Sequence, residues 1–189
     1  MKKVLICGNA PTLPEDLKGV KLDMFDKVVR SNFWQPIEGY DNRCDIHVFS
    51  INQALLEKLR LEPKDREYWC PFRNVDRVML DYTGKKCDWV MKHSERKRAV
   101  KEIGAEYPTT GAFAIWHALD LGWEVYIAGF TFFEEHFDTE DREKIHYFKE
   151  QDFVKMMKDT RHDPSVEKIW VYKLMREGKV HKVSRIFRS

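Results

Sequence analysis

Residues 110–121 constrain the fold more than any other part of the sequence. The segment starts with a threonine of the kind that caps helices, is apolar on every side, and is followed by Gly122, a typical helix stop. A helix that is apolar all round must be buried. Residues 124–128 then form a strand-like apolar run after a short connection, and a helix followed closely by a strand is typical of α/β proteins.

Shorter patterns predict the other elements. Brief apolar runs favour buried strands at residues 4–7, 27–30, 45–49 and 77–80, and helices are predicted at 11–18, 53–60 and 85–101. A last helix begins at Asp163 and Pro164, ends at Gly178, and has a predicted apolar stripe of Val166, Ile169, Trp170 and Leu174. We therefore expect a single α/β domain over residues 1–189: a mostly parallel, Rossmann-like sheet with helices on both faces.

Composition limits the class of protein. With 43% hydrophobic residues and 13% aromatic residues, the chain of 189 residues is not disordered and can bury a core. A net charge of +2 is too small to imply nucleic-acid binding. Basic residues do gather in 85–101 and from Lys168 onward, where a solvated helix face is favoured over a surface for an anionic partner.

Localisation and metal binding are predicted from what the sequence lacks. The chain has no apolar signal region and no run of about 18 apolar residues that would span a bilayer. Its four cysteines lie far apart, without a Cys-x-x-Cys pair, so we expect a cytoplasmic protein with reduced thiols. No Asp-x-Asp pair is present to clamp a metal–diphosphate, so we expect neither a metal site nor a bound cofactor.

Two points of the sequence favour a ligand site at the carboxyl ends of the strands, where open α/β sheets bind ligands. Gly8 and Asn9 follow the first strand; a glycine lets a ligand approach the backbone, and the Asn amide offers a donor and an acceptor. Because the Gly-x-Gly-x-x-Gly fingerprint is absent, a dinucleotide is disfavoured. An ordinary tight turn explains this segment equally well.

The second point is the start of the buried helix, at Thr109, Thr110 and Gly111. Free N–H groups and the helix dipole suit this terminus to phosphate or ribose hydroxyls, although such hydroxyls are more often plain caps. Two histidines are candidates for acid–base chemistry. His146 precedes Tyr147, and His162 precedes the capped helix, where a neutral imidazole can act as a base.

Together these segments resemble the four sialylmotifs of sialyltransferases, in their usual order. Residues 7–13 and 25–33 are similar to the large motif, and residues 107–111 and 124–130 to the small motif. His146-Tyr147-Phe148 resembles the third motif, and His162 with Glu167 matches the His-x-x-x-x-Glu very small motif. No single motif is specific, but all four in this order are hard to reach by chance. They span residues 4 to 167, nearly the whole length of the chain.

The resemblance implies a glycosyltransferase that moves sialic acid or a related sugar from a CMP-activated donor to an acceptor hydroxyl, with inversion and without a metal. It implies that His162 deprotonates the acceptor and that His146 and Tyr147 contact the departing phosphate. A lid over the donor is expected at residues 131–145. The residues implied to hold the nucleotide are Gly8, Asn9, Asn32, Thr109, Thr110 and Gly111.

Two departures and two alternatives accompany the resemblance. Animal sialyltransferases pair a large-motif cysteine with one in the small motif, whereas Cys7 has no counterpart in residues 107–130, and no membrane anchor is apparent. Both favour a cytosolic bacterial or viral form. The first alternative is a phage-type nucleotide-sugar transferase that glycosylates modified DNA bases, with residues 85–101 and the basic tail from Lys168 onward tracking phosphates. The second is a nucleotide-binding module that has lost catalysis.

Overall fold

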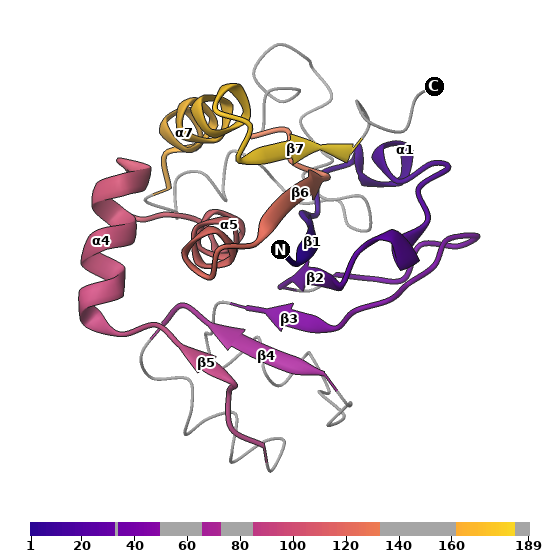
Figure 1. Cartoon of the computed structure of the whole chain (residues 1–189), viewed down its shortest axis with the longest axis horizontal. Coiled ribbons are helices and arrows are strands. Elements are labelled where there is room, and N and C mark those ends of the chain that lie inside the picture. The colour runs from indigo at the N-terminus through magenta and orange to yellow at the C-terminus, as the bar shows by residue number, and fades with distance from the viewer. Residues whose placement is uncertain (33, 50–65, 73–84, 133–161, 184–189) are drawn as a thin grey trace.

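The computed structural model describes residues 1–32, 34–49, 66–72, 85–132 and 162–183. In this part of the chain seven strands form one sheet in the order β5-β4-β3-β2-β1-β6-β7, and every neighbouring pair is parallel (Figure 1). The strands are β1 (Lys3–Cys7), β2 (Lys27–Ser31), β3 (Ile46–Val48), β4 (Glu67–Cys70), β5 (Trp89–Val90), β6 (Glu124–Ala128) and β7 (Val180–Lys182).

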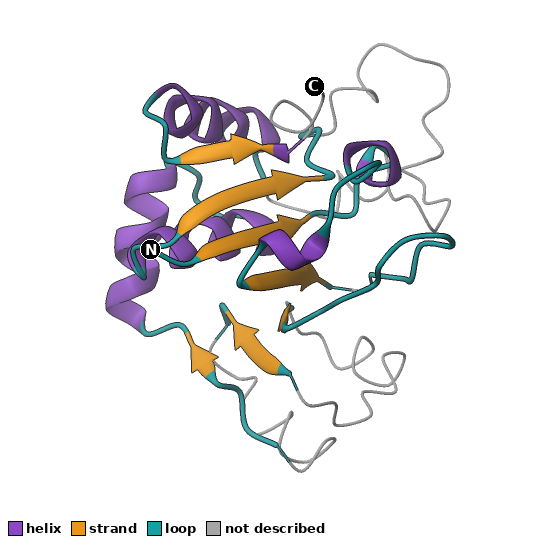
Figure 2. Ribbon diagram, turned by 45° about the vertical axis from the view of Figure 1, so that its right-hand side comes forward, coloured by secondary structure: helices purple, strands orange, loops and turns teal. Residues whose placement is uncertain are grey.

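Helices cover both faces of the sheet, as Figures 1 and 2 show. One face packs against α4 (His93–Ile103), α5 (Thr110–Asp120) and α7 (Pro164–Arg176), and the other against α1 (Leu13–Asp16) and the 3-10 turn η1 (Leu22–Met24). Alternate residues of β1 pack into two hydrophobic cores, one on each face of the sheet. Val4 and Ile6 belong to the core that includes α5, and Leu5 and Cys7 to the core that includes α1. The predicted α/β architecture is confirmed.

The strand order reverses at β1. The chain passes from β1 to β2 on one side of the sheet, and β6 later adds to the other side of β1. Connections leave such a point in opposite directions, so a crevice opens beyond the carboxyl ends of the two strands. The fold therefore places the ends of β1, β2 and β6 around one location.

Several sequence predictions are corrected in detail. The helix expected over residues 85–101 begins only at His93, because residues 89 and 90 pair with β4 as a strand. Glu95 Oε2 accepts the backbone N–H of Lys92 at 2.6 Å and fixes that helix start. Ile169 is not part of a buried stripe, since it is 67% exposed, and Glu167 lies on the buried side of α7 instead. The elements expected at 53–60 and 77–80 lie outside the described residues.

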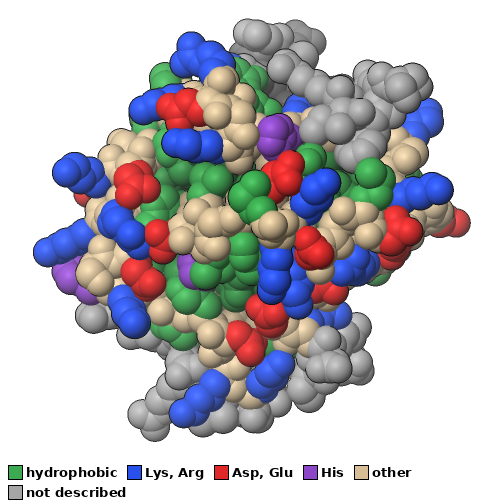
Figure 3. All heavy atoms as spheres, viewed as in Figure 1, with side chains coloured by type: hydrophobic (Ala, Val, Ile, Leu, Met, Phe, Trp, Pro, Cys, Tyr) green, Lys and Arg blue, Asp and Glu red, His purple; other side chains and the backbone are tan. Residues whose placement is uncertain are grey.

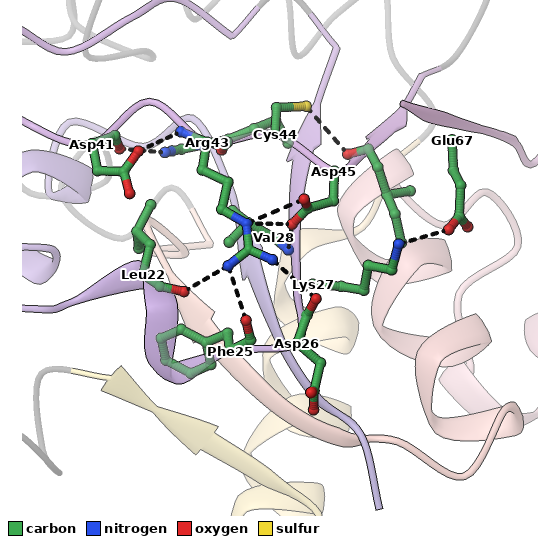
Figure 4. A network of polar contacts seen from close by, with 12 residues as sticks. Leu22, Phe25, Asp26, Lys27, Val28, Asp41, Arg43, Cys44, Asp45 and Glu67 are labelled. Atoms are coloured by element: carbon green, nitrogen blue, oxygen red, sulfur yellow. Dashed lines mark hydrogen bonds and ion pairs between the residues drawn. The ribbon is translucent and has the colours of Figure 1, made fainter. Parts of the chain in front are cut away.

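Arg43 fixes the chain entering two central strands (Figure 4). Its guanidinium donates to the carbonyl oxygens of Leu22, Phe25 and Asp26, each at 3.0 Å. The same group pairs with Asp45 at 2.9 Å, and the Asp45 carboxylate accepts the backbone N–H of Val28 at 2.7 Å. The turn before β2 is thereby tied to the residue that precedes β3.

The basic side chains are spread among acidic ones on the face shown in Figure 3. On α4, Arg98 pairs with Asp120 at 2.8 Å and lies over the Trp116 ring at 4.9 Å. Near the end of the described chain, Lys179 pairs with Glu177 at 2.8 Å. These basic residues thus take part in ion pairs and ring contacts with the fold itself. Within the described ranges, no helix is both long and apolar enough to cross a membrane.

Candidate active site

A pocket lies at the carboxyl ends of β1, β2 and β6, where the strand order reverses. It brings together five of the residues expected to hold a nucleotide, from segments far apart in the sequence. Thr110 is not among them, because it points into the core and is 5% exposed. The pocket is lined by Gly8, Asn9, Ala10, Ser31, Asn32, Thr109, Gly111, Gly129, Phe130, Thr131, Phe132, Pro164 and Glu167.

Asn9 presents an unused acceptor at this pocket. Its side-chain nitrogen donates to the Ser31 carbonyl at 3.0 Å, and this bond fixes which way the amide points. The amide oxygen is then the free end, and it is buried without a hydrogen-bond partner. Buried polar atoms are nearly always paired, so an unpaired acceptor lining a pocket suits a ligand that brings a hydroxyl or amino donor.

Two glycines allow the backbone to close tightly beneath the pocket. A Cβ placed on Gly8 would lie 2.2 Å from the carbonyl oxygen of Gly129, the residue that follows β6. A Cβ on Gly111 would lie 2.7 Å from the Phe130 ring. Each glycine thus makes room for a neighbouring chain segment, and Phe130 rests on the helix start as part of the pocket wall.

Glu167 and Thr109 join the starts of α7 and α5. The carboxylate of Glu167 accepts the Thr109 backbone N–H at 2.6 Å and the Thr109 hydroxyl at 2.7 Å. The same hydroxyl oxygen accepts the N–H of Ala112 at 3.2 Å as the helix cap. The Thr109 hydroxyl is therefore already used in hydrogen bonds within the protein. We expect the backbone around Thr109, which these bonds hold in place, to contact the nucleotide.

Burial controls the protonation of Glu167. Desolvation raises its pKa from 4.5 to about 7, against the opposing effect of the two Thr109 hydrogen bonds, and the nearby Asp163 carboxylate raises it further. The folded protein therefore retains a proton that the unfolded chain releases between about pH 4.5 and 7. The stability contributed by this group is full at the acidic end of that window and falls as the pH rises through it.

We therefore expect Glu167→Gln to change how stability depends on pH. As the pH rises from 4.5 to 7.5, the free energy of unfolding of the wild-type protein should fall by on the order of 3 kcal/mol more than that of the variant. Urea unfolding at half-unit pH steps measures the difference, and Glu106→Gln, on an exposed side chain, is the control. Parallel profiles for wild type and Glu167→Gln would contradict the raised pKa.

His162 is oriented by a backbone carbonyl. Its Nδ1 lies 2.6 Å from the carbonyl oxygen of Tyr107, and because a carbonyl only accepts, Nδ1 carries the proton. The lone pair is then on Nε2, the nitrogen suited to take a proton from a substrate. Asp163 is used elsewhere, since its carboxylate accepts the N–H groups of Ser165 and Val166 as the cap of α7.

His162 and Glu167, five positions apart, both bond to the segment that precedes α5. His162 bonds to Tyr107 and Glu167 bonds to Thr109, so the start of α7 is attached twice to the segment that leads into α5. Pro164, between them, lines the pocket. His162 therefore lies on a segment that is held beside the pocket.

Part of the expected site lies outside the described residues, namely His146, Tyr147 and residues 133–145 of the expected lid. In the described part of the chain, no group of three or more His, Cys, Asp or Glu side chains is arranged to hold a metal ion.

Several residues that line the pocket carry no individual signal in the sequence. Ser31, Gly129 and Phe130 belong to the motif-like segments, but only their position at strand ends marks them as candidates. Phe132 lies further along the same segment with a φ of 54°. The signal that finds them is the convergence of parallel strand ends, which requires knowing that β6 lies beside β1.

A larger cavity lies at the opposite end of the sheet. Its volume is about 470 Å³, against about 120 Å³ for the pocket described above. It is bordered by Trp116, Trp123 and Trp170 and by Met1 and Glu124 at the amino ends of strands. Ligands of open α/β sheets bind at the carboxyl ends, so the smaller pocket is the candidate site.

Comparison with solved structures identifies the class of fold. A crystal structure of a mammalian sialyltransferase matches 96% of this chain and 68% of its own, with a TM-score of 0.59 and 17% identity. A second structure, of a mammalian sialyltransferase in complex with Gal-beta-1-3GalNAc-ortho-nitrophenol, has the same coverage, a TM-score of 0.60 and 19% identity. The chain has the Rossmann-like variant of the GT-A glycosyltransferase fold.

Sequence comparison gives a family match for part of the chain. The family model for glycosyltransferase family 29 (sialyltransferase) matches residues 88–179, which include α4, α5, β6 and the whole of α7. A search of curated protein sequences gives no significant match. The family match over residues 88–179 and the shared fold make the chain similar to sialyltransferases, and this similarity supports a glycosyltransferase.

Proposed function

We propose that the chain transfers sialic acid or a related sugar from a CMP-activated donor to an acceptor hydroxyl, by direct displacement with inversion and without a metal. The observation that carries the proposal is the pocket at the strand reversal, which gathers Gly8, Asn9, Asn32, Thr109 and Gly111 beside the segment bearing His162. The family match over residues 88–179 supports the same class of reaction.

His162 is the proposed general base. Its Nε2 takes the proton of the acceptor hydroxyl while that oxygen forms a bond to the anomeric carbon and the bond from this carbon to the phosphate oxygen breaks. CMP leaves with the bonding electron pair. The Tyr107 carbonyl, 2.6 Å from Nδ1, holds the tautomer that this step requires and stabilises the imidazolium that forms.

The pocket residues are proposed to bind the nucleotide. The unpaired amide oxygen of Asn9 suits a ribose hydroxyl or the amino group of a base, and Asn32 lies beside it. By resemblance to the third motif, His146 and Tyr147 would contact the departing phosphate, and residues 131–145 would close over the donor. A single phosphate in the donor fits a sequence without an Asp-x-Asp pair.

The test is a panel of CMP-, UDP- and GDP-sugars, incubated with the protein without acceptor while nucleotide release is followed. We expect slow release from a CMP-sugar that a chelator does not change. Release from a UDP-sugar alone would overturn the CMP assignment. Tight binding of duplex DNA that weakens steeply with salt would favour the DNA-modifying alternative. If the protein binds a nucleotide but releases it from no sugar donor, whichever acceptor is added, the result would favour the alternative of a nucleotide-binding module that has lost catalysis.

A further inference from the structure

His47 is a buried histidine next to the candidate site, and none of the motif-like segments contains it. It lies in the middle of β3, between Arg30 of β2 and Tyr68 of β4 in the strand register. Only 2% of it is exposed. Its ring packs against Phe49 and Tyr68, with centroid separations of 5.2 and 6.3 Å, so its orientation is fixed by the core.

The hydrogen bond of His47 determines its tautomer. Its Nε2 lies 2.7 Å from the carbonyl oxygen of Asn32, and because that oxygen only accepts, Nε2 carries the proton. The Nδ1 atom is buried without a partner. Desolvation lowers the pKa of the ring to about 4, opposed by the Asn32 hydrogen bond and assisted by the Arg66 charge. The ring is therefore neutral near pH 7 and serves as a fixed donor.

Asn32 has an unusual backbone conformation. It follows β2 directly, has a φ of 49°, and lines the pocket. L-residues with positive φ are uncommon; Asn adopts this conformation more readily than most, and neighbouring contacts select it at a given position. Those contacts come from β3: the Asn32 N–H donates to the Val48 carbonyl at 2.9 Å, and its carbonyl accepts from His47. Both backbone polar groups of Asn32 are thus held by the neighbouring strand.

We propose that His47 is a positioning residue for nucleotide binding: through its Nε2–H it holds Asn32 in the left-handed conformation that directs this residue to the pocket. The role rests on the proposed function, since Asn32 must contact the nucleotide for it to matter. His47 itself touches no substrate. It acts through the Asn32 backbone alone.

The experiment compares two substitutions of His47. His47→Phe keeps a ring of similar shape but removes the donor, and His47→Gln places an amide N–H near the position of Nε2. Calorimetric titration with CMP measures affinity, and a thermal melt of each variant measures folding. We expect His47→Phe to weaken CMP binding about tenfold, while His47→Gln stays within about threefold of wild type.

A double-mutant cycle with Asn32→Ala separates positioning from a general structural effect. If His47 acts through Asn32, His47→Phe has no further effect on CMP affinity once the Asn32 side chain is gone. The same tenfold loss in both backgrounds would overturn the proposal, as would a His47→Phe variant that binds CMP like wild type. If His47→Phe does not fold, His47→Asn, whose amide is too short to reach, replaces it in the same cycle.

The two proposals fail in distinguishable ways. If the wild-type protein binds neither CMP nor a CMP-sugar, the proposed function is wrong, and the role of His47 falls with it. If the wild type binds CMP and Asn32→Ala weakens binding while His47→Phe does not, the site assignment stands and only the positioning role of His47 is wrong.

Discussion

His162→Ala is expected to reduce nucleotide release from a CMP-sugar by about 10²- to 10⁴-fold, the usual contribution of a general base. The imidazole is bound to the Tyr107 carbonyl through Nδ1 and offers Nε2 to the substrate, whereas alanine can accept no proton. CMP affinity should stay close to wild type, because the pocket-lining residues are unchanged. Initial release rates at saturating donor, with CMP titrations alongside, measure the two effects separately.

The matched control for this variant is His93→Ala. His93 is exposed at the start of α4 and lies outside the pocket, so its removal should leave the release rate unchanged. A His162→Ala protein that folds, binds CMP and releases nucleotide at the wild-type rate would remove His162 from the mechanism. A loss of CMP affinity with an unchanged maximal rate would assign it to binding instead.

Gly8→Ala is expected to destabilise the protein by at least about 3 kcal/mol, the upper part of the range for overpacking. The added methyl group would lie 2.2 Å from the carbonyl oxygen of Gly129, and because this atom belongs to the backbone, β1 and β6 must separate to relieve the contact. For a domain of this size the melting temperature should fall by about 6–12 °C. A thermal melt followed by circular dichroism measures it.

Gly122→Ala provides the comparison. Gly122 has a φ of 72° but nothing within 4 Å of its added Cβ, so only the conformational cost applies. That cost is about 1 kcal/mol, or about 2–4 °C in melting temperature. If Gly8→Ala melted no lower than Gly122→Ala, the close approach of the β1 and β6 ends would not be a constraint on the fold.

The central elements of the fold were predictable because their signals are local. The buried helix α5 is apolar on all sides, and its threonine cap was predicted one residue too late: the Thr109 hydroxyl, not that of Thr110, accepts the Ala112 N–H. Asp163 caps α7 as predicted. The strands β1 and β6 each contain four successive buried apolar residues, and β2 contains two, Val28 and Val29, as parallel sheets covered on both faces require.

The edge elements were not predictable in the same way. The strand β7 has three residues, two of them His181 and Lys182, and β5 has two. Neither length nor apolar periodicity marks such segments, and pairing with β6 or β4 is what makes them strands. The α7 stripe was misassigned at Ile169 because the buried side of that helix includes a carboxylate, which a hydrophobic pattern excludes.

The candidate site depended on contacts between distant residues. Glu167 is buried because Thr109, 58 positions earlier, supplies two donors to its carboxylate. Sequence alone placed Thr109 and Thr110 together, but the cap geometry directs the first toward Glu167 and the second into the core. His47 carried no motif signal, since its relevance comes only from the Asn32 carbonyl in the adjacent strand.

A crystal structure of the protein with CMP tests most directly whether the strand-end pocket is the nucleotide site. We expect the nucleotide beyond the ends of β1, β2 and β6, with a donor of CMP within hydrogen-bond distance of the Asn9 amide oxygen and with Asn32 in contact. Density for CMP in the cavity bordered by Trp116, Trp123 and Trp170, at the other end of the sheet, would contradict this assignment.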